Sequence, residues 1–352
     1  MPWIDDPSAH HQVKLYFGNG NANNSITNDG NSDMQPDLIW FKSRDSGFSH
    51  YYVDSSRGRD KGLYTDSTSA EVTSSGTTTD CQSFDSDGFT VGTPEDASST
   101  NYNGDEIVAW QWKFGGGTTS TNTDGDINST VQVNSDVGCS IVQYQPSNTT
   151  ARNIGHGLGK KPGMIWIRNR TRTEDTVIWN RQAGTGGARL NATAAYNTST
   201  TSYVNTVNSS TFNVGGDFAV NGGYPYVAYC WAETQGFSKF GTYRGNGSST
   251  DNAFVYTGFR PSFVMTHGVN IASQWRIYDS TRDTDNPAHA RQFPYTAITD
   301  QFDADAAIDI LSNGFKPYTA SGDMAASGYI YHYYAFAENP FVTSSGVPGT
   351  AR

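Results

Sequence analysis

Short apolar runs alternate with polar segments along the whole chain. Runs such as 38–41, 164–167 and 226–231 are shorter than an amphipathic helix, and Gly, Asn, Ser and Asp fill the segments between them. Such runs recur about every ten to fifteen residues, a spacing typical of strands in a sandwich or barrel. Helical periodicity is weak, and its best candidate is the short segment 303–311. The pattern therefore predicts an all-β fold.

The apolar runs form a repeat that occurs three times. In each copy a proline precedes a largely apolar run, and eighteen residues after that proline a polar residue ends a second run. Equal spacing at three places indicates one structural unit used three times. The prolines are Pro36, Pro162 and Pro261, and the polar residues are Asp54, Asn180 and Asp279.

Two further landmarks complete the repeat. A tyrosine precedes the proline by eighteen residues in the second and third copies and by twenty in the first. Each copy closes with an aromatic run that is apolar on both faces, which is typical of a strand covered on each side in the middle of a sheet. The tyrosines are Tyr16, Tyr144 and Tyr243, and the closing runs are 107–112, 226–231 and 331–336.

The repeat divides the chain into three modules of about 100 residues, a size that suits two packed antiparallel sheets. The segment between the first two modules is rich in Gly, Thr and Asn, a composition typical of a flexible linker. The last two modules follow each other directly, so we expect them to pack together and the first to be more independent. The predicted divisions are a short N-terminal arm (1–11), module 1 (12–114), the linker (115–138), module 2 (139–237), module 3 (238–341) and a C-terminal tail (342–352).

Composition narrows the class of protein. Hydrophobic residues make up 35% and charged residues 16%, yet the chain holds 20 Tyr, 18 Phe and 8 Trp, so it has large rings to bury and is not disordered. The formal net charge is -11 and no long basic run occurs, which argues against nucleic acid as a partner.

The ends and the cysteines carry further information. The start, 1–6, lacks the basic and apolar regions of a signal peptide, and no stretch reaches the ~18 apolar residues of a membrane span. We therefore expect synthesis in the cytoplasm without membrane insertion. Cys81, Cys139 and Cys230 have no close pair or metal-ligand spacing, and their odd number leaves at least one thiol outside any intramolecular disulfide.

Motifs for catalysis or for a cofactor are missing from the sequence. No His-Glu-x-x-His zinc motif and no Gly-x-Ser-x-Gly elbow occurs. The run 155–160 resembles a phosphate loop but lacks its Lys-Ser/Thr ending, so a turn before Pro162 is predicted instead. Glu233 and Glu338 recur at equivalent positions, as architectural residues do in a repeat. We expect no catalytic residue, no cofactor and no metal.

Acidic residues near turns have structural interpretations. Asp54 with Arg57 and Asp279 with Arg282 are expected to form local ion pairs that hold a turn. The Asp-rich segments Asp85–Gly88 and Asp124–Asp126 lack the full spacing of a calcium loop, so turn formation explains them.

Several phrases of the chain resemble a known repeat. The segments 42–44, 154–162, 237–243, 255–261 and 311–315 look like a repeat found in virion proteins of marine and cyanobacterial phages. The resemblance covers almost the whole chain. It implies a tail-fibre-like or other structural virion protein with modules similar to the concanavalin or jelly-roll sandwich. It implies no defined ligand.

Three hypotheses of function follow. The first is a non-catalytic virion surface protein that adheres to host glycans, with other virion proteins and further copies of itself as partners. The second is a capsid decoration or tail adaptor that binds other virion proteins. The third is an enzyme that degrades surface polysaccharide. Lectin-like sites stack aromatic rings on sugars, and a buried position inside the sandwich is the alternative for each candidate. The candidates are Trp179, Trp275 and Tyr278.

Overall fold

The computed structural model describes residues 3–75, 80–93, 100–302, 306–343 and 345. The regular structure among them consists of strands and of short 3-10 segments such as η1 (Pro7–Ala9). The expected all-β class is confirmed. Among the described residues, none of the helical segments has the length and hydrophobicity of a membrane-spanning helix.

Module 1 consists of a six-stranded sheet in the order β1-β9-β3-β4-β5-β6 and a three-stranded sheet in the order β2-β8-β7. Its strands are antiparallel. They are β1 (His11–Phe17), β2 (Asn24–Ile26), β3 (Leu38–Ser43), β4 (Tyr51–Asp54), β5 (Gly58–Tyr64), β6 (Val72–Thr73), β7 (Cys81–Asp85), β8 (Gly88–Val91) and β9 (Glu106–Trp112).

Module 2 repeats this plan with a seven-stranded sheet in the order β10-β11-β12-β19-β14-β15-β16 and a second sheet in the order β13-β18-β17. Its strands are β10 (Ser120–Asn122), β11 (Ser129–Asn134), β12 (Cys139–Tyr144), β13 (Arg152–Gly155), β14 (Met164–Asn169), β15 (Val177–Asn180), β16 (Ala188–Arg189), β17 (Val204–Val207), β18 (Thr211–Val214) and β19 (Tyr226–Trp231).

Module 3 has sheets in the orders β20-β28-β22-β23 and β21-β27-β26, with a separate pair β24-β25. The order β1-β9-β3-β4 of module 1 therefore has an exact counterpart in β12-β19-β14-β15 and in β20-β28-β22-β23. The strands of module 3 are β20 (Ser238–Arg244), β21 (Val255–Tyr256), β22 (Phe259–Gly268), β23 (Arg276–Asp279), β24 (Ala290–Arg291), β25 (Gln301–Phe302), β26 (Ala307–Leu311), β27 (Gly314–Tyr318) and β28 (Ile330–Pro340).

The segment 115–138, predicted as a flexible linker, contains two strands of module 2. β10 pairs with β11, and β11 pairs with β12 over five residues, from Thr130 opposite Gln143 to Asn134 opposite Cys139. The prediction was wrong because the Gly-rich start of the segment dominated its composition. The later part, Ser129–Asn134, is rich in β-branched residues that suit a strand.

The helical candidate 303–311 is also corrected, although residues 303–305 lie outside the described residues. β26 occupies Ala307–Leu311 and pairs with β27. Ile308 and Ile310 are both buried in the core of module 3, so the apolar residues follow the two-residue period of a strand.

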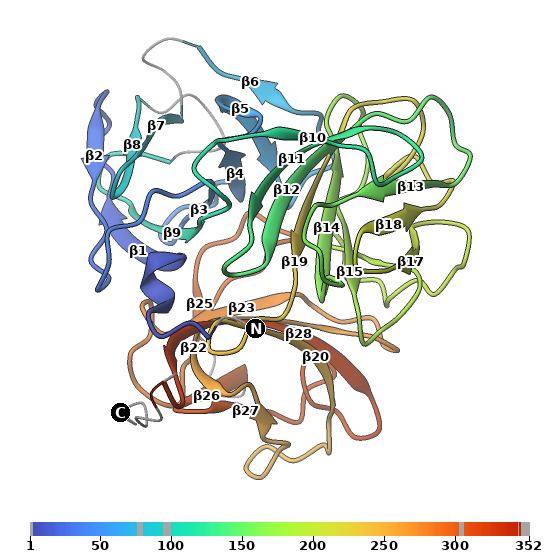
Figure 1. Cartoon of the computed structure of the whole chain (residues 1–352). Coiled ribbons are helices and arrows are strands. Elements are labelled where there is room, and N and C mark those ends of the chain that lie inside the picture. The colour runs from blue at the N-terminus through green and yellow to red at the C-terminus, as the bar shows by residue number, and fades with distance from the viewer. Residues whose placement is uncertain (1–2, 76–79, 94–99, 303–305, 344, 346–352) are drawn as a thin grey trace.

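Module 1 is not independent, because the three large sheets share one core. Figure 1 shows the blue, green and orange parts of the chain gathered around one centre. At this centre lie the rings of Trp112, Trp231 and Phe336, which each end the closing run of one module. Their ring centroids are 6.2, 5.4 and 6.1 Å apart, and each pair meets edge to face. Each of these rings therefore contacts rings from both of the other modules.

Equivalent backbone hydrogen bonds close the modules into a ring. Glu71 of module 1 donates its N–H to the carbonyl of Arg170 in module 2 over 2.8 Å. Tyr196 of module 2 donates to Val269 of module 3 over 3.1 Å, and Asp300 of module 3 donates to Arg44 of module 1 over 2.9 Å. Each acceptor is the eighth residue after the repeat proline, so the arrangement has quasi-threefold symmetry.

The closing strands are covered on both faces, as their composition predicts. In β9, Trp110 and Trp112 face the shared core, whereas Ile107 and Ala109 face a second core inside module 1. The outer faces of the other two large sheets pack in the same way on the small sheets of their own modules.

Candidate functional site

The three predicted sugar-stacking residues are buried, so that prediction is corrected. Trp179 is 3% exposed, and Trp275 and Tyr278 are fully buried. The ring of Trp275 stacks on His267 at 4.3 Å, and the hydroxyl of Tyr278 donates to the carbonyl of Ala306 over 2.6 Å. The alternation of side chains along a strand shows which residues share one face of the sheet, but not whether another module covers that face. In this structure the shared core covers one face of each large sheet and an outer core covers the other.

The two predicted local ion pairs are present, and both are fully buried. Arg57 contacts Asp54, and Arg282 contacts Asp279 over 2.6 Å. In each pair the carboxylate also accepts the backbone N–H of the arginine over 2.8 Å. Each pair therefore holds the turn that follows its strand, as expected.

Each ion pair extends into a neighbouring module. The hydroxyl of Tyr229 in module 2 donates to Asp54 over 2.6 Å. Arg57 also contacts Glu71 over 2.7 Å, and Arg170 of module 2 binds both carboxylate oxygens of Glu71 over 2.8 Å. Burial alone would raise the pKa of Glu71, but the two arginines outweigh it and the pKa is lowered.

The counterpart between modules 3 and 1 has the same form. The indole N–H of Trp110 donates to Asp279 over 3.0 Å. Arg282 contacts Asp300 over 2.7 Å, and Asp300 contacts Arg44 of module 1 over 2.6 Å. Burial would raise the pKa of Asp300, but Arg282 and Arg44 lower it below its ordinary value. Both networks therefore fix how neighbouring modules sit together.

The other chemical candidates serve the fold. His156 is buried, which lowers its pKa to about 4, and its ring accepts the N–H of Leu158 in the turn before Pro162. In the Asp-rich turns, Asp87 accepts the N–H of Met34, and Asp126 accepts the N–H of Asn153.

Within the described residues no group of three His, Cys, Asp or Glu side chains is placed to hold a metal. The cysteines are buried and free, and they are Cys81, Cys139 and Cys230.

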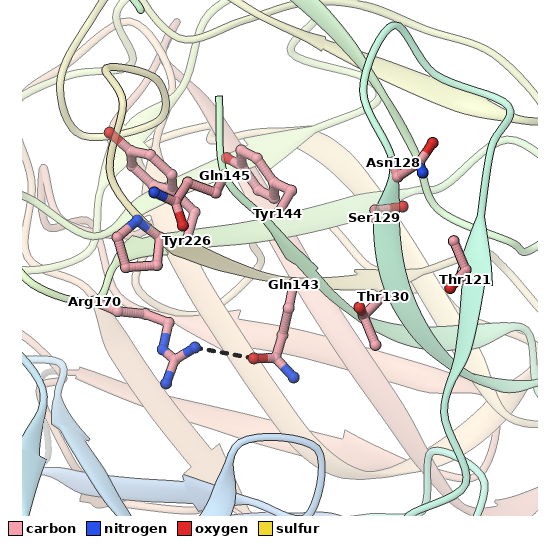
Figure 2. Close-up of a pocket in the computed structure, with 10 residues that line it drawn as sticks. Thr121, Asn128, Ser129, Thr130, Gln143, Tyr144, Gln145, Arg170 and Tyr226 are labelled. Atoms are coloured by element: carbon pink, nitrogen blue, oxygen red, sulfur yellow. Dashed lines mark hydrogen bonds between the residues drawn. The ribbon is translucent and has the colours of Figure 1, made fainter. Parts of the chain in front are cut away.

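A polar pocket lies on module 2 beside its junction with module 1 (Figure 2). Its volume is about 420 Å³, within the range of about 300–1,000 Å³ that is typical of small-molecule sites. We call it the module 2 pocket. It is lined by Thr121, Asn128, Ser129, Thr130, Gln143, Tyr144, Gln145, Arg170, Pro225 and Tyr226.

Strand pairing positions the side chains of this pocket. Thr121 lies opposite Thr130, and Thr130 lies opposite Gln143, so three polar residues form a row across β10, β11 and β12. Tyr144 and Tyr226 stack at 5.1 Å with an angle of 14° between their rings. Four of the ten lining residues lie in the segment 115–138, which was predicted to be a linker, and the pocket was missed for that reason.

The pocket presents hydroxyl and amide groups on a fixed frame. Gln143 is held in place, since its side chain donates to Ser56 of module 1 and accepts from Arg170, both over 2.9 Å. The side chains of Asn128 and Thr130 are exposed and have no hydrogen-bond partner among the described residues. Free amides and hydroxyls of this kind can both donate to and accept from the hydroxyl groups of a sugar.

Comparison with known proteins gives one match. No curated protein and no solved structure matches the chain. A family model with the description "Domain of unknown function (DUF7483)" matches residues 6–340, which is nearly the whole of the three-module body. The chain therefore belongs to the DUF7483 family.

Proposed function

We propose that this protein is a non-catalytic surface protein of a bacteriophage particle that adheres to host-cell glycans. The resemblance of its repeat to phage virion proteins supports the virion assignment. The observation that carries glycan binding is the module 2 pocket, where unpartnered hydroxyl and amide groups line a cavity of about 420 Å³. Weak binding at one such pocket gives a high avidity when one particle carries many copies of the protein.

A rigid frame supports this function. The pocket lies between strands of module 2 and is fixed to module 1 through Gln143 and Arg170. Ordered side chains lose little entropy when a ligand binds, which preserves affinity in a site that makes only a few hydrogen bonds.

A second candidate function is a capsid decoration or tail adaptor. Two large apolar side chains, Phe17 and Phe302, are 67% and 65% exposed. Exposed rings of this size suit contacts with other proteins of a particle, including further copies of this chain. Light scattering of the purified protein measures self-association directly.

The test is binding of fluorescently labelled protein to intact bacterial host cells and to cells oxidised with periodate. Periodate cleaves the vicinal diols of sugars, so adhesion to glycans predicts saturable binding that oxidation removes. Binding that survives oxidation contradicts a glycan receptor. A protein that binds no cells, at the oligomeric state established by light scattering, favours the decoration or adaptor function.

A further inference from the structure

A second cleft lies where the start of the chain meets module 3. Its volume is about 380 Å³. Ile4 donates its N–H to the carbonyl of Gln235 over 3.2 Å, and Phe341 donates to the carbonyl of Gly258 over 3.1 Å, which fixes the walls. We call it the N-terminal cleft. It is lined by Trp3, Glu233, Thr234, Gln235, Gly236, Ser238, Lys239, Tyr256, Thr257, Gly258, Phe341 and Val342.

Aromatic rings from three separate segments line this cleft. They belong to Trp3, Tyr256 and Phe341, and Tyr256 is 58% exposed. An exposed ring beside a cavity of this size offers an apolar face to a ligand. In contrast, the tyrosines of the module 2 pocket are buried, with 4% and 0% exposure.

The internal repeat shows that the fold does not require Tyr256. Its predecessor Val255 pairs with Phe315, as Ile154 pairs with Phe212 and Ile26 with Phe89 in the other modules. The next residue is therefore the structural equivalent in each copy, and only module 3 places a ring there. These equivalents are Thr27, Gly155 and Tyr256.

Polar groups stand beside the rings. The carboxylate of Glu233 accepts from the ammonium of Lys239 over 3.2 Å and from the backbone N–H of Phe240 over 3.3 Å. These hydrogen bonds fix the position of the carboxylate of Glu233. The ammonium of Lys239 has further N–H groups that can donate to a ligand. The indole nitrogen of Trp3 is buried and has no hydrogen-bond partner within the described residues.

We propose that the N-terminal cleft is a second saccharide site, in which Tyr256 and Trp3 stack on the apolar face of a pyranose ring. Glu233 and Lys239 then bind hydroxyl groups at the edge of that ring. A sugar ring has this division into apolar face and polar edge, which matches the cleft. The inference rests on the proposed glycan adhesion for its ligand class and gives each chain two sites. Two linked sites raise avidity without any new contact.

The test is saturation-transfer-difference NMR with methyl pyranosides of glucose, galactose, mannose and N-acetylglucosamine. The background is the Asn128→Ala/Thr130→Ala double variant, which weakens the module 2 pocket. We expect ring-face protons of at least one sugar to be saturated. Tyr256→Thr, which imports the residue of module 1, should weaken that sugar's binding about tenfold or more.

The matched control is Phe17→Thr, which removes an exposed ring outside the cleft and should leave the signal unchanged. Circular dichroism of each variant shows that it is folded. The inference is overturned if every sugar is silent, or if Tyr256→Thr and Trp3→Ala both retain full saturation. The proposed function fails separately, by the absence of periodate-sensitive binding to cells.

Discussion

At the scale of single residues, the sixth position of each closing run carries a ring that lies where the three modules meet. Trp112, Trp231 and Phe336 are each at most 3% exposed, and each contacts the other two. A ring at this point packs against three sheets at once. It therefore contributes more to the stability of the molecule than a ring inside one module.

We expect Trp112→Ala to lower the free energy of unfolding by about 3–5 kcal/mol, because the cavity lies where no single module can collapse to fill it. Urea unfolding followed by circular dichroism measures this change. Phe17→Ala, which removes an exposed ring, is the control and should change stability by no more than about 0.5 kcal/mol. A loss below about 1 kcal/mol for Trp112→Ala would contradict the shared core.

A second prediction uses the repeat as its own control. Asp54→Asn leaves the buried guanidinium of Arg57 with one carboxylate fewer, so we expect a loss of about 3 kcal/mol in the free energy of unfolding. Module 2 has Asn180 and Ala183 at the equivalent positions. The double variant Asp54→Asn/Arg57→Ala copies that pair and should recover part of the loss. A double variant less stable than the single one would argue against this interpretation.

The residues that sequence reasoning placed correctly are those whose partners lie nearby in the chain. Asp54 and Arg57 are three positions apart, and their pairing was predicted. Their further contacts with Glu71 and Arg170 were not, because 99 residues separate those two. The same limit explains the sugar-stacking candidates, since a module from elsewhere in the chain covers Trp275.

At the scale of the element, β22 and β28 bring two buried histidines together in module 3. Nδ1 of His267 lies 3.2 Å from Nε2 of His332. Burial lowers the pKa of His267 to about 3, and burial together with the neighbouring His267 sets the pKa of His332 well below its ordinary value. Trp275, Tyr196 and Tyr334 are the rings packed around them.

These histidines predict acid sensitivity. The unfolded chain takes up their protons near pH 6.5 and the folded chain does not, so stability present above about pH 6.5 is lost as the pH falls toward about 3. Within this range, each histidine makes the free energy of unfolding fall by about 1.4 kcal/mol for each unit by which the pH is lowered. His332→Val introduces the residue found at the equivalent positions Val108 and Val227 of the other modules. This variant should lose the contribution of one histidine to the pH dependence of the free energy of unfolding. Urea midpoints between about pH 7 and pH 5 test this, and an unchanged slope would contradict it.

Element by element, the repeat was the most informative feature of the sequence. The proline-anchored runs became β3, β14 and β22, and the closing runs lie within β9, β19 and β28. Segments without counterparts in the other copies were predicted least well. β10 and β11 are additions to module 2, and their backbone hydrogen bonds to β12 could not be inferred from a composition that resembles a linker.

At the scale of the whole molecule, quasi-threefold closure makes three repeats into one body. This closure could not be predicted from the sequence, because the independence of the modules was inferred from the residues that connect them. The decisive residues are instead on the inner faces of the sheets, where Trp40, Trp166 and Met265 occupy equivalent positions in the shared core.

One cooperative unfolding transition is therefore expected for the full chain. Removing any module exposes the aromatic faces of the other two, so partly folded states are costly. Scanning calorimetry should give a single peak whose calorimetric and van't Hoff enthalpies agree. Three resolved peaks would show that the modules fold separately.

Cell binding by matched variants tests glycan adhesion most directly. Wild-type protein, the pocket variant Asn128→Ala/Thr130→Ala and a control variant, Ser147→Ala/Thr149→Ala, which changes two exposed hydroxyls of module 2 outside the pocket, are titrated on intact and periodate-oxidised cells. We predict saturable binding that oxidation abolishes, about tenfold weaker for the pocket variant and unchanged for the control. Wild-type binding that is absent, or equally strong on oxidised cells, would contradict glycan adhesion.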